Sequence, residues 1–273
     1  MAYLDRPDAR IYFEDTGTGI PILLSHGFAA TASMWDRQLA ALADRYRVIR
    51  WDMRGHGRTK TENDVRAYRP NLVLDDMQAI LDRCQVDRAV IAGLSLGGYM
   101  SIAFCAAYPD RTALLGLFGT GPGFKDAAAR AQWNERAEAY ATQFETEGLP
   151  AAVRYANRTY MNRTQEPASA PIELGFHYHD GTIGLAAAAR GLLTQRDAST
   201  IESLPLITVG TLIVVGSEDK PFLPASNYMA KKIPHAERVV IEGAGHAPNM
   251  THPNPFNESL RSFLDRCCQH TRP

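Results

Sequence analysis

The strongest chemical signal in the chain is a serine set between glycines. Ser95 stands in the segment Gly93–Gly97, which reads G-x-S-x-G, between an apolar run at Ala89–Ala92 and a helical pattern at Gly97–Tyr108. In a strand-turn-helix context this motif forces a sharp turn that projects the serine hydroxyl clear of the backbone. The start of the helix offers free N–H groups and the positive end of its dipole to a developing oxyanion. We therefore expect Ser95 to be a nucleophile and the amide of Leu96 to be an oxyanion donor.

A serine nucleophile needs a general base, and the base needs a carboxylate to orient it. Of the eight histidines, His246 lies in a glycine-containing loop directly after the apolar run Arg238–Ile241. Asp219 follows another apolar run, Thr211–Val215. Glu218 beside it is the alternative, because adjacent side chains point in different directions. Serine, then aspartate, then histidine is a known chain order for such a triad. We expect the serine to form a triad with Asp219 and His246.

A second oxyanion donor is expected from the loop after the predicted strand Pro21–Ser25. This loop begins with His26, and a glycine precedes the backbone N–H of Phe28. We expect the amides of Phe28 and Leu96 to hold the oxyanion together, each contributing about 2.7–4 kcal/mol in the transition state. His26, and His56 in another glycine-containing turn, are expected to make structural hydrogen bonds.

Short apolar runs alternate with amphipathic segments along most of the chain, which is typical of α/β architecture with a mainly parallel sheet. An N-terminal hairpin is expected from Ala2–Leu4 and Arg10–Glu14. Buried strands are expected at Pro21–Ser25, Arg47–Trp51, Ala89–Ala92, Ala113–Phe118, Thr211–Val215 and Arg238–Ile241. Helices are expected at Met34–Arg45, Asn71–Cys84, Gly97–Tyr108 and Asn254–Cys268.

The segment 125–203 breaks this alternation. It is rich in Ala and Arg, and its helical patterns lie at Ala127–Glu147, Ala151–Tyr160 and Thr182–Leu193. We expect a helical cap over the carboxyl edge of the sheet, inserted into a core formed by 1–124 and 204–273. The alternative is a set of ordinary crossover helices, but about 80 residues are too many for one crossover, whose usual length is a dozen or more residues.

Composition narrows the function classes. The chain has 273 residues, 45% of them apolar and 22% charged, with a net charge of −1. A large basic face for nucleic acid or anionic membrane is therefore not expected. No apolar run approaches the ~18 residues of a membrane-spanning helix. The N-terminus has no apolar leader, and the four cysteines form no C-x-x-C pair. We expect a reduced, cytoplasmic protein with a small-molecule substrate; the oligomeric state stays open.

Taken together, the motifs resemble the α/β-hydrolase superfamily. The matching segments are His26–Phe28, Asp52–Gly57, Gly93–Gly97, Gly216–Asp219 and Gly245-His246. Within it the chain is similar to small carboxylesterases and 3-oxoadipate enol-lactonases. The resemblance implies a mostly parallel, eight-stranded sheet flanked by helices. It also implies hydrolysis of carboxylic esters or lactones through an acyl-enzyme, with no cofactor and no metal.

Three other functions on the same fold stay open. A C–C bond hydrolase is disfavoured, because its glycine-rich oxyanion loop and His-Trp pair are missing: the chain reads Phe28-Ala29-Ala30 and His246-Ala247. A cofactor-free haloperoxidase or perhydrolase would use the same triad. A non-enzymatic ligand receptor would bind without turnover. Fold alone cannot choose between these functions.

Specificity is expected to come from the cap and the loops at the sheet edge. Candidate pocket residues are Trp35, Phe124, Trp133, Tyr160 and Phe176. For each of them, packing in a core is the alternative. Four arginines could pair with a substrate carboxylate or else lie on solvated helix faces: Arg154, Arg158, Arg163 and Arg190.

Overall fold

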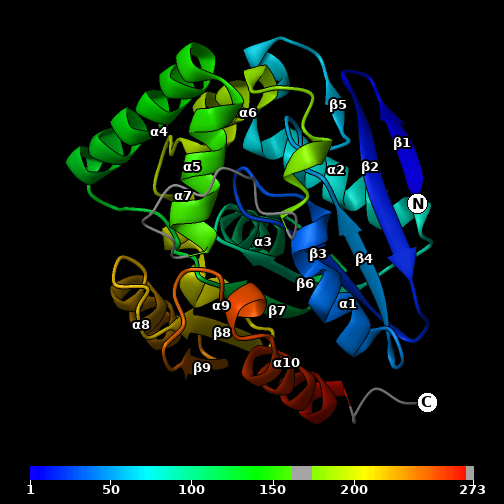
Figure 1. The fold of residues 1–273 in the computed structure, drawn as a ribbon. Helices are drawn as coiled ribbons and strands as arrows, with labels where there is room; N and C mark the ends of the chain where they lie inside the picture. The colour runs from blue at the N-terminus through cyan, green and yellow to red at the C-terminus, as the bar shows by residue number, and fades with distance from the viewer. Residues whose placement is uncertain (162–173, 269–273) are drawn as a thin grey trace.

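A computed structural model describes residues 1–161 and 174–268 (Figure 1). Within these residues nine strands form one sheet in the order β1-β2-β4-β3-β6-β7-β8-β9, with β5 paired to β2. The strands are β1 (Ala2–Arg6), β2 (Ala9–Thr16), β3 (Ile20–Ser25), β4 (Tyr46–Trp51), β5 (Lys60–Thr61), β6 (Ala89–Leu94), β7 (Thr112–Phe118), β8 (Thr211–Gly216) and β9 (Ala236–Ile241). The antiparallel pairs are those of β2 with β1, β4 and β5; the other strand pairs are parallel. The predicted mostly parallel sheet is confirmed, with β5 as an addition.

The central strands are buried on both faces. Every residue of β6 and of β8 is buried. A parallel strand covered by helices on both sides reads as a continuous apolar run, which is why these two strands were readily predicted. In the register, Ser25 pairs with Gly93 and Gly216 pairs with Ile241. The loops that follow β3, β6, β8 and β9 therefore leave the same edge of the sheet.

Two helix pairs lie on opposite faces of the sheet (Figure 1). On one face α1 (Asp36–Leu42) packs on α10 (Pro253–Cys268), and on the other α2 (Pro70–Arg83) packs on α3 (Leu96–Ala107). Two more helices, α8 (Leu223–Lys232) and α9 (Pro248–Thr251), follow β8 and β9. Short 3-10 helices complete the core: η1 (Ala32–Trp35), η2 (Val65–Ala67), η3 (Pro109–Arg111) and η7 (Leu204–Leu206).

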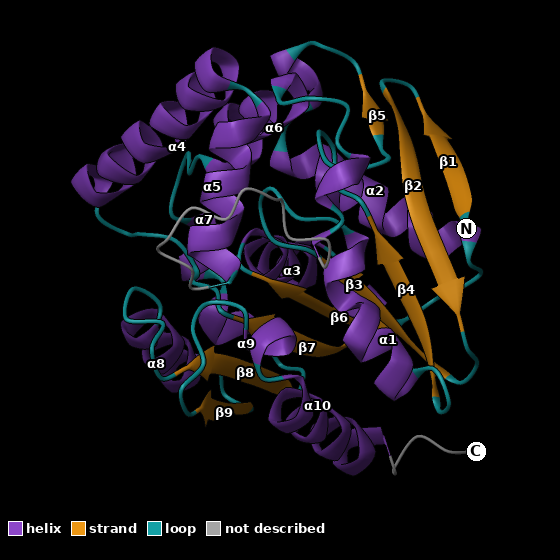
Figure 2. Cartoon of the chain, viewed as in Figure 1, coloured by secondary structure: helices purple, strands orange, loops and turns teal. Residues whose placement is uncertain are grey.

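Between β7 and η7 the elements of the described chain are all helices. Its elements are α4 (Ala127–Glu147), α5 (Leu149–Tyr160), η5 (Phe176–Tyr178), α6 (Ile183–Ala188), the π-helical turn η6 (Ala189–Leu193) and α7 (Ser199–Glu202). Helix α4 packs on α5, α6 and η6, and Figure 2 shows these helices gathered on one side of the sheet. This packing supports the proposed cap, 125–203.

Some element boundaries differ from the prediction. The expected helix Met34–Arg45 is divided into η1 and α1, and the expected helix Thr182–Leu193 into α6 and η6. Helix α8 was not predicted, because Pro221, Pro224 and Asn227 make its sequence resemble a loop; Pro224 stands in the first turn, where proline is tolerated. No helix in the described ranges is long and apolar enough to cross a membrane.

Candidate active site

Ser95 occupies the turn between β6 and α3 in a strained backbone conformation, with φ 55° and ψ −115°. Its N–H donates to the carbonyl of Phe118 over 2.9 Å. The flanking glycines leave no room for a side chain: a Cβ on Gly93 would lie 2.3 Å from the carbonyl carbon of Gly97, and one on Gly97 would lie 2.2 Å from the oxygen of Ser25. Such strain persists only where the surrounding structure enforces it, and it often marks a functional position.

The candidate oxyanion donors belong to two segments that follow paired strands, the start of α3 after β6 and the loop after β3. Leu96 is the first residue of α3, so its N–H has no partner within the helix. Phe28 lies in the loop after β3, where Ala29 is held at φ 59°. The hydroxyl of Tyr160 donates to the carbonyl of Phe28 over 2.6 Å. A Cβ on Gly27 would lie 2.4 Å from that hydroxyl, which explains the glycine.

The structure brings Asp219 to His246. The Nδ1 atom of His246 lies 2.9 Å from Oδ2 of Asp219, which is 4% exposed. Glu218 is instead exposed, with its carboxylate 3.6 Å from the ammonium of Lys220. The loops after β8 and β9 approach closely, since a Cβ on Gly216 would lie 2.1 Å from the oxygen of Ala244. Of the two adjacent acids, Asp219 is therefore the one that can orient the imidazole.

Two aromatic rings hold the imidazole of His246 in place. The ring of Phe222 lies 4.7 Å away and that of Tyr160 5.8 Å away, centroid to centroid. Because Nδ1 is engaged by Asp219, the imidazole atom left for proton transfer is Nε2.

Two adjoining cavities open at Ser95. The first, of about 200 Å³, is lined mainly by apolar residues that include Leu96, Phe124 and Trp133; we name it the apolar cavity. The second, of about 300 Å³, includes His246, Arg136 and Arg158; we name it the polar cavity. Both are also lined by Trp133, Arg136, Leu193, Pro221 and Phe222.

The five predicted pocket residues separate into three groups. Phe124 and Trp133 line the apolar cavity. Tyr160 is 1% exposed, with its hydroxyl bound to the chain itself. Trp35 and Phe176 are not among the residues that line these two cavities. Trp35 is fully buried against Phe118 and Phe256, and Phe176 is buried beside His179.

The predicted arginines also differ in their surroundings. Arg158 lines the polar cavity. Arg154 is paired with Glu147, and Arg190 with Glu138 and Glu145. Arg163 lies outside the described residues. Sequence reasoning missed Arg136, for which no motif gives a signal. It also missed Tyr99 in the apolar cavity, although its spacing of four residues from Ser95 on a predicted helix could have indicated it.

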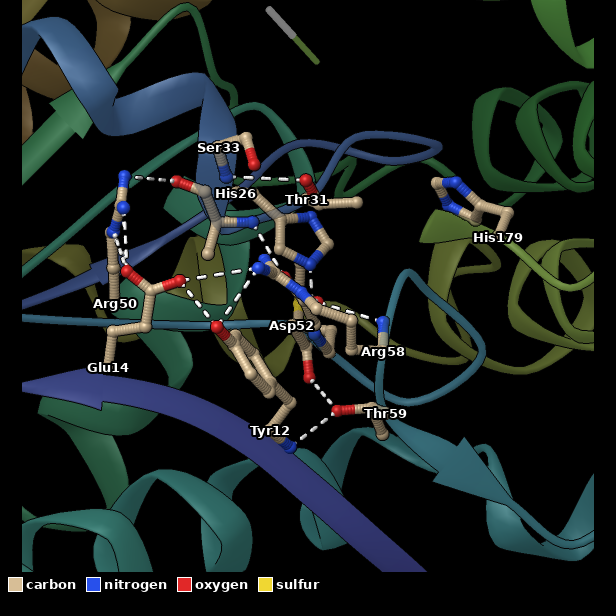
Figure 3. A network of polar contacts seen from close by, with 12 residues as sticks. Tyr12, Glu14, His26, Thr31, Ser33, Arg50, Asp52, Arg58, Thr59 and His179 are labelled. Atoms are coloured by element: carbon tan, nitrogen blue, oxygen red, sulfur yellow. Dashed lines mark hydrogen bonds and ion pairs between the residues drawn. The ribbon is translucent and has the colours of Figure 1, made fainter. Parts of the chain in front are cut away.

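A buried polar network anchors the loop that carries Phe28 (Figure 3). One carboxylate oxygen of Asp52 accepts the N–H of Ala32 over 2.7 Å, and the other accepts the N–H of Arg58 over 2.9 Å. Arg58 in turn pairs with Glu14, which Arg50 binds over 2.6 Å. His26 accepts the N–H of Met53 at Nε2 over 2.8 Å. The Nδ1–H of His56 donates to the carbonyl of Arg54. Both histidines therefore make the structural hydrogen bonds expected of them.

Known proteins resemble this chain in sequence and in fold. The 3-oxoadipate enol-lactonase 2 of Acinetobacter baylyi is 27% identical over 248 residues, covering 90% of this chain and 88% of the relative. A thermophilic esterase from Thermogutta terrifontis superposes with a TM-score of 0.80 at 29% identity, covering 95% of this chain and 94% of the esterase. The enol-lactonase of Burkholderia xenovorans LB400 shares the fold, with a TM-score of 0.83 at 24% identity and coverage of 96% and 99%. Residues 22–259 match the model of the Alpha/beta hydrolase family, and the chain belongs to that family.

Proposed function

We propose that the protein is a serine hydrolase that cleaves carboxylic esters or lactones through an acyl-enzyme on Ser95. The observation that carries the proposal is the 2.9 Å pair of His246 and Asp219 beside the strained turn at Ser95, with all three residues lining one cavity. Similarity to an enol-lactonase and an esterase supports the same reaction class.

In the proposed mechanism Ser95 Oγ attacks the substrate carbonyl carbon and gives its proton to Nε2 of His246. The carbonyl oxygen becomes an oxyanion that accepts hydrogen bonds from the amides of Phe28 and Leu96. Asp219 stabilises the imidazolium and fixes its tautomer. The C–O bond then breaks, and the leaving alkoxide takes the proton from Nε2.

Water completes the cycle. It attacks the acyl-enzyme, and His246 accepts one of its protons and returns it to Ser95 as the acid leaves. A lactone keeps its alcohol tethered to the acyl group, so the same steps open the ring. The chemistry needs no cofactor and no metal.

The test is acid release followed in a pH-stat, over short esters, long esters and lactones. Ser95→Ala should lower turnover by at least ~10³-fold relative to wild type. Ser101→Ala is a matched control, because this hydroxyl lies in the same helix and donates to the carbonyl of Gly97 instead. The control should stay within a few-fold of wild type.

Each outcome separates the candidate reactions. The preferred substrate class ranks esterase against lactonase. Activity that survives in Ser95→Ala would overturn the nucleophile assignment. Absence of acid release from folded wild-type protein would favour a C–C hydrolase or a receptor, and halogenation that depends on peroxide would favour a haloperoxidase.

A further inference from the structure

The two cavities at Ser95 differ in which part of the catalytic machinery they contain, and this inference rests on the proposed acyl transfer. The polar cavity includes His246, whereas the lining of the apolar cavity includes Leu96 but not His246. The general acid must lie within hydrogen-bond reach of the leaving oxygen. The leaving alcohol therefore belongs in the polar cavity, and the acyl chain belongs in the apolar cavity.

A third hollow, which we name the outer groove, lies behind the apolar cavity. Its volume is about 450 Å³, and it runs between α2, α3 and α7 over Leu74, Ala103 and Ala107. Tyr99 lines both the outer groove and the apolar cavity, and it is the one residue common to the described linings of the two. Tyr99 therefore lies between the proposed acyl site and a larger, partly apolar space. It shares this position with the segment 193–196, whose residues line the two spaces alternately.

The position of Tyr99 follows from the helix that carries the nucleophile. Tyr99 stands four residues after Ser95, and its N–H donates to the carbonyl of Ser95 over 3.0 Å, so both residues share one face of the first turn of α3. Across the groove, the hydroxyl of Thr200 in α7 donates to the Tyr99 hydroxyl over 3.1 Å. The ring is thus fixed at both ends, by its own helix and by α7.

We propose that Tyr99 is the end wall of the acyl site and sets the longest apolar acyl chain that the enzyme accepts. Chains that end before the ring fill the apolar cavity. Longer chains meet the ring of Tyr99 and must displace it from Thr200. Removing the ring joins the apolar cavity to the outer groove, which gives a longer chain an apolar path along the alanines of α3.

The experiment measures kcat/KM for 4-nitrophenyl esters of straight-chain acids from acetate to dodecanoate. Wild type should show a sharp fall beyond one chain length. Tyr99→Ala should move that fall to longer chains and raise the ratio of kcat/KM for decanoate over butyrate by about 10-fold. Tyr99→Leu, which keeps apolar packing in a smaller volume, should move the ratio in the same direction by less. If Tyr99→Ala fails to fold, Tyr99→Leu alone still tests the proposal.

Two control variants are needed. One separates the effect of the Tyr99 ring from that of its hydroxyl hydrogen bond, and the other separates the effect of the apolar cavity from that of the polar cavity. Tyr99→Phe keeps the wall and should keep the wild-type length profile. Tyr140 lines the polar cavity but not the apolar cavity. Tyr140→Ala should therefore leave the ratio of kcat/KM for decanoate over butyrate unaltered. An unchanged ratio in both Tyr99→Ala and Tyr99→Leu would overturn the proposal, as would an equal shift in Tyr140→Ala. If wild type hydrolyses none of the esters in a Ser95-dependent manner, the proposed function itself fails, which is a different result.

Discussion

The hydroxyl of Tyr160 donates a 2.6 Å hydrogen bond to the backbone carbonyl of Phe28, while its ring stacks on His246 with centroids 5.8 Å apart. Tyr160 ends α5, in the segment inserted between β7 and β8. One side chain of the insertion therefore contacts both the loop of the proposed oxyanion donor and the proposed base. The strained φ of 59° at Ala29 shows that this loop needs such support.

Replacing Tyr160 by Phe should lower kcat by about 10-fold with little change in KM. The variant keeps the ring on His246 but leaves the buried carbonyl of Phe28 without its donor, a loss of about 1–3 kcal/mol. The loop can relax, and the amide of Phe28 then points less accurately at the oxyanion. Steady-state kinetics on a short ester would measure the effect.

Tyr155→Phe is the matched control for this change. Tyr155 is also a buried tyrosine of α5, and its ring lies 5.4 Å from that of Phe28. It lines the polar cavity, and the substitution keeps its ring there. Loss of its hydroxyl should not alter kcat beyond a few-fold. Equal kcat in Tyr160→Phe and wild type would show that the hydrogen bond to Phe28 does not position the oxyanion loop.

The two adjacent acids after β8 should differ strongly in their contribution to catalysis. Asp219→Asn should lower kcat by about 10⁴-fold, because an amide favours the wrong tautomer of His246. Glu218→Gln should stay within about 3-fold, since its carboxylate is exposed and an exposed pair contributes at most about 1 kcal/mol. Comparable losses in both variants would contradict the assignment of Asp219.

The sequence predicted that Ser95, Asp219 and His246 lie together better than it predicted which residues line the cavities, and the reason is physical. The turn at Ser95 needs glycines at fixed positions, because a Cβ on Gly93 or Gly97 would lie only 2.2–2.3 Å from backbone atoms; its geometry is therefore encoded locally. The strands that carry Asp219 and His246 are apolar runs whose ends must share one sheet edge. A local motif and a parallel topology were therefore enough to predict the proximity of residues more than 100 positions apart.

The pocket depends on packing between distant helices, which has no local code. Trp35 and Trp133 look alike in sequence, yet Trp35 is fully buried on Phe256 while Trp133 lines the apolar cavity. The partner of Trp133 is the carbonyl of Leu193, 60 residues away. Such contacts could not be predicted from the periodicity of either helix.

Three buried histidines pack in a row beside Phe28, which carries one of the proposed oxyanion donors. The ring centroids of His26 and His56 lie 4.9 Å apart, and those of His56 and His179 lie 6.2 Å apart. Burial lowers the pKa of His26 to about 3 and holds the pKa values of His56 and His179 below their usual range. All three are therefore neutral in the folded protein at pH 7.

Acid should destabilise the fold through this cluster. The unfolded chain takes up protons at histidine below about pH 6.5, whereas the folded chain does not until its lower pKa values are reached. The stability contributed by the neutral histidines is thus fully present above pH 6.5 and is lost as the pH falls toward their lower pKa values in the folded chain. For His26 this loss is about 1.4 kcal/mol per pH unit. Urea unfolding should show a loss of at least about 1.4 kcal/mol between pH 7.5 and pH 5.5, because the pKa of His26, at about 3, lies below this whole interval.

His179→Gln tests whether the cluster is the cause. The variant removes one of the three titrating groups, so its loss of stability between the same two pH values should be smaller than that of wild type. Buried carboxylates with lowered pKa values, such as Glu14, also reduce the stability of the fold when they are protonated, but only at lower pH. An identical pH dependence in wild type and variant would assign the acid sensitivity to other groups.

Arg136 and Arg158 line the polar cavity, are exposed, and have no ion-pair partner among the described residues. If the leaving alcohol occupies that cavity, these cations should favour an alcohol that carries a carboxylate. The comparison is between 3-acetoxybenzoate and phenyl acetate, which share an acyl group and differ by that charge. Arg136→Gln and Arg158→Gln should each lower the ratio of kcat/KM for the first over the second by about 5-fold, a modest effect because exposed charges are screened.

Arg154→Gln provides the matched control for the arginine variants. It lies one turn before Arg158 on α5, but its guanidinium is already paired with Glu147 and it does not line the polar cavity. Its substitution removes the same charge from the molecule, so a change in the ratio there would indicate long-range attraction rather than a local contact. Raising the salt concentration from 0.05 to 0.5 M should shrink the wild-type preference, since the Debye length falls well below 10 Å. If the ratio of kcat/KM for the two esters changes neither in Arg136→Gln and Arg158→Gln nor with salt concentration, recognition of an anionic leaving group by these arginines is excluded.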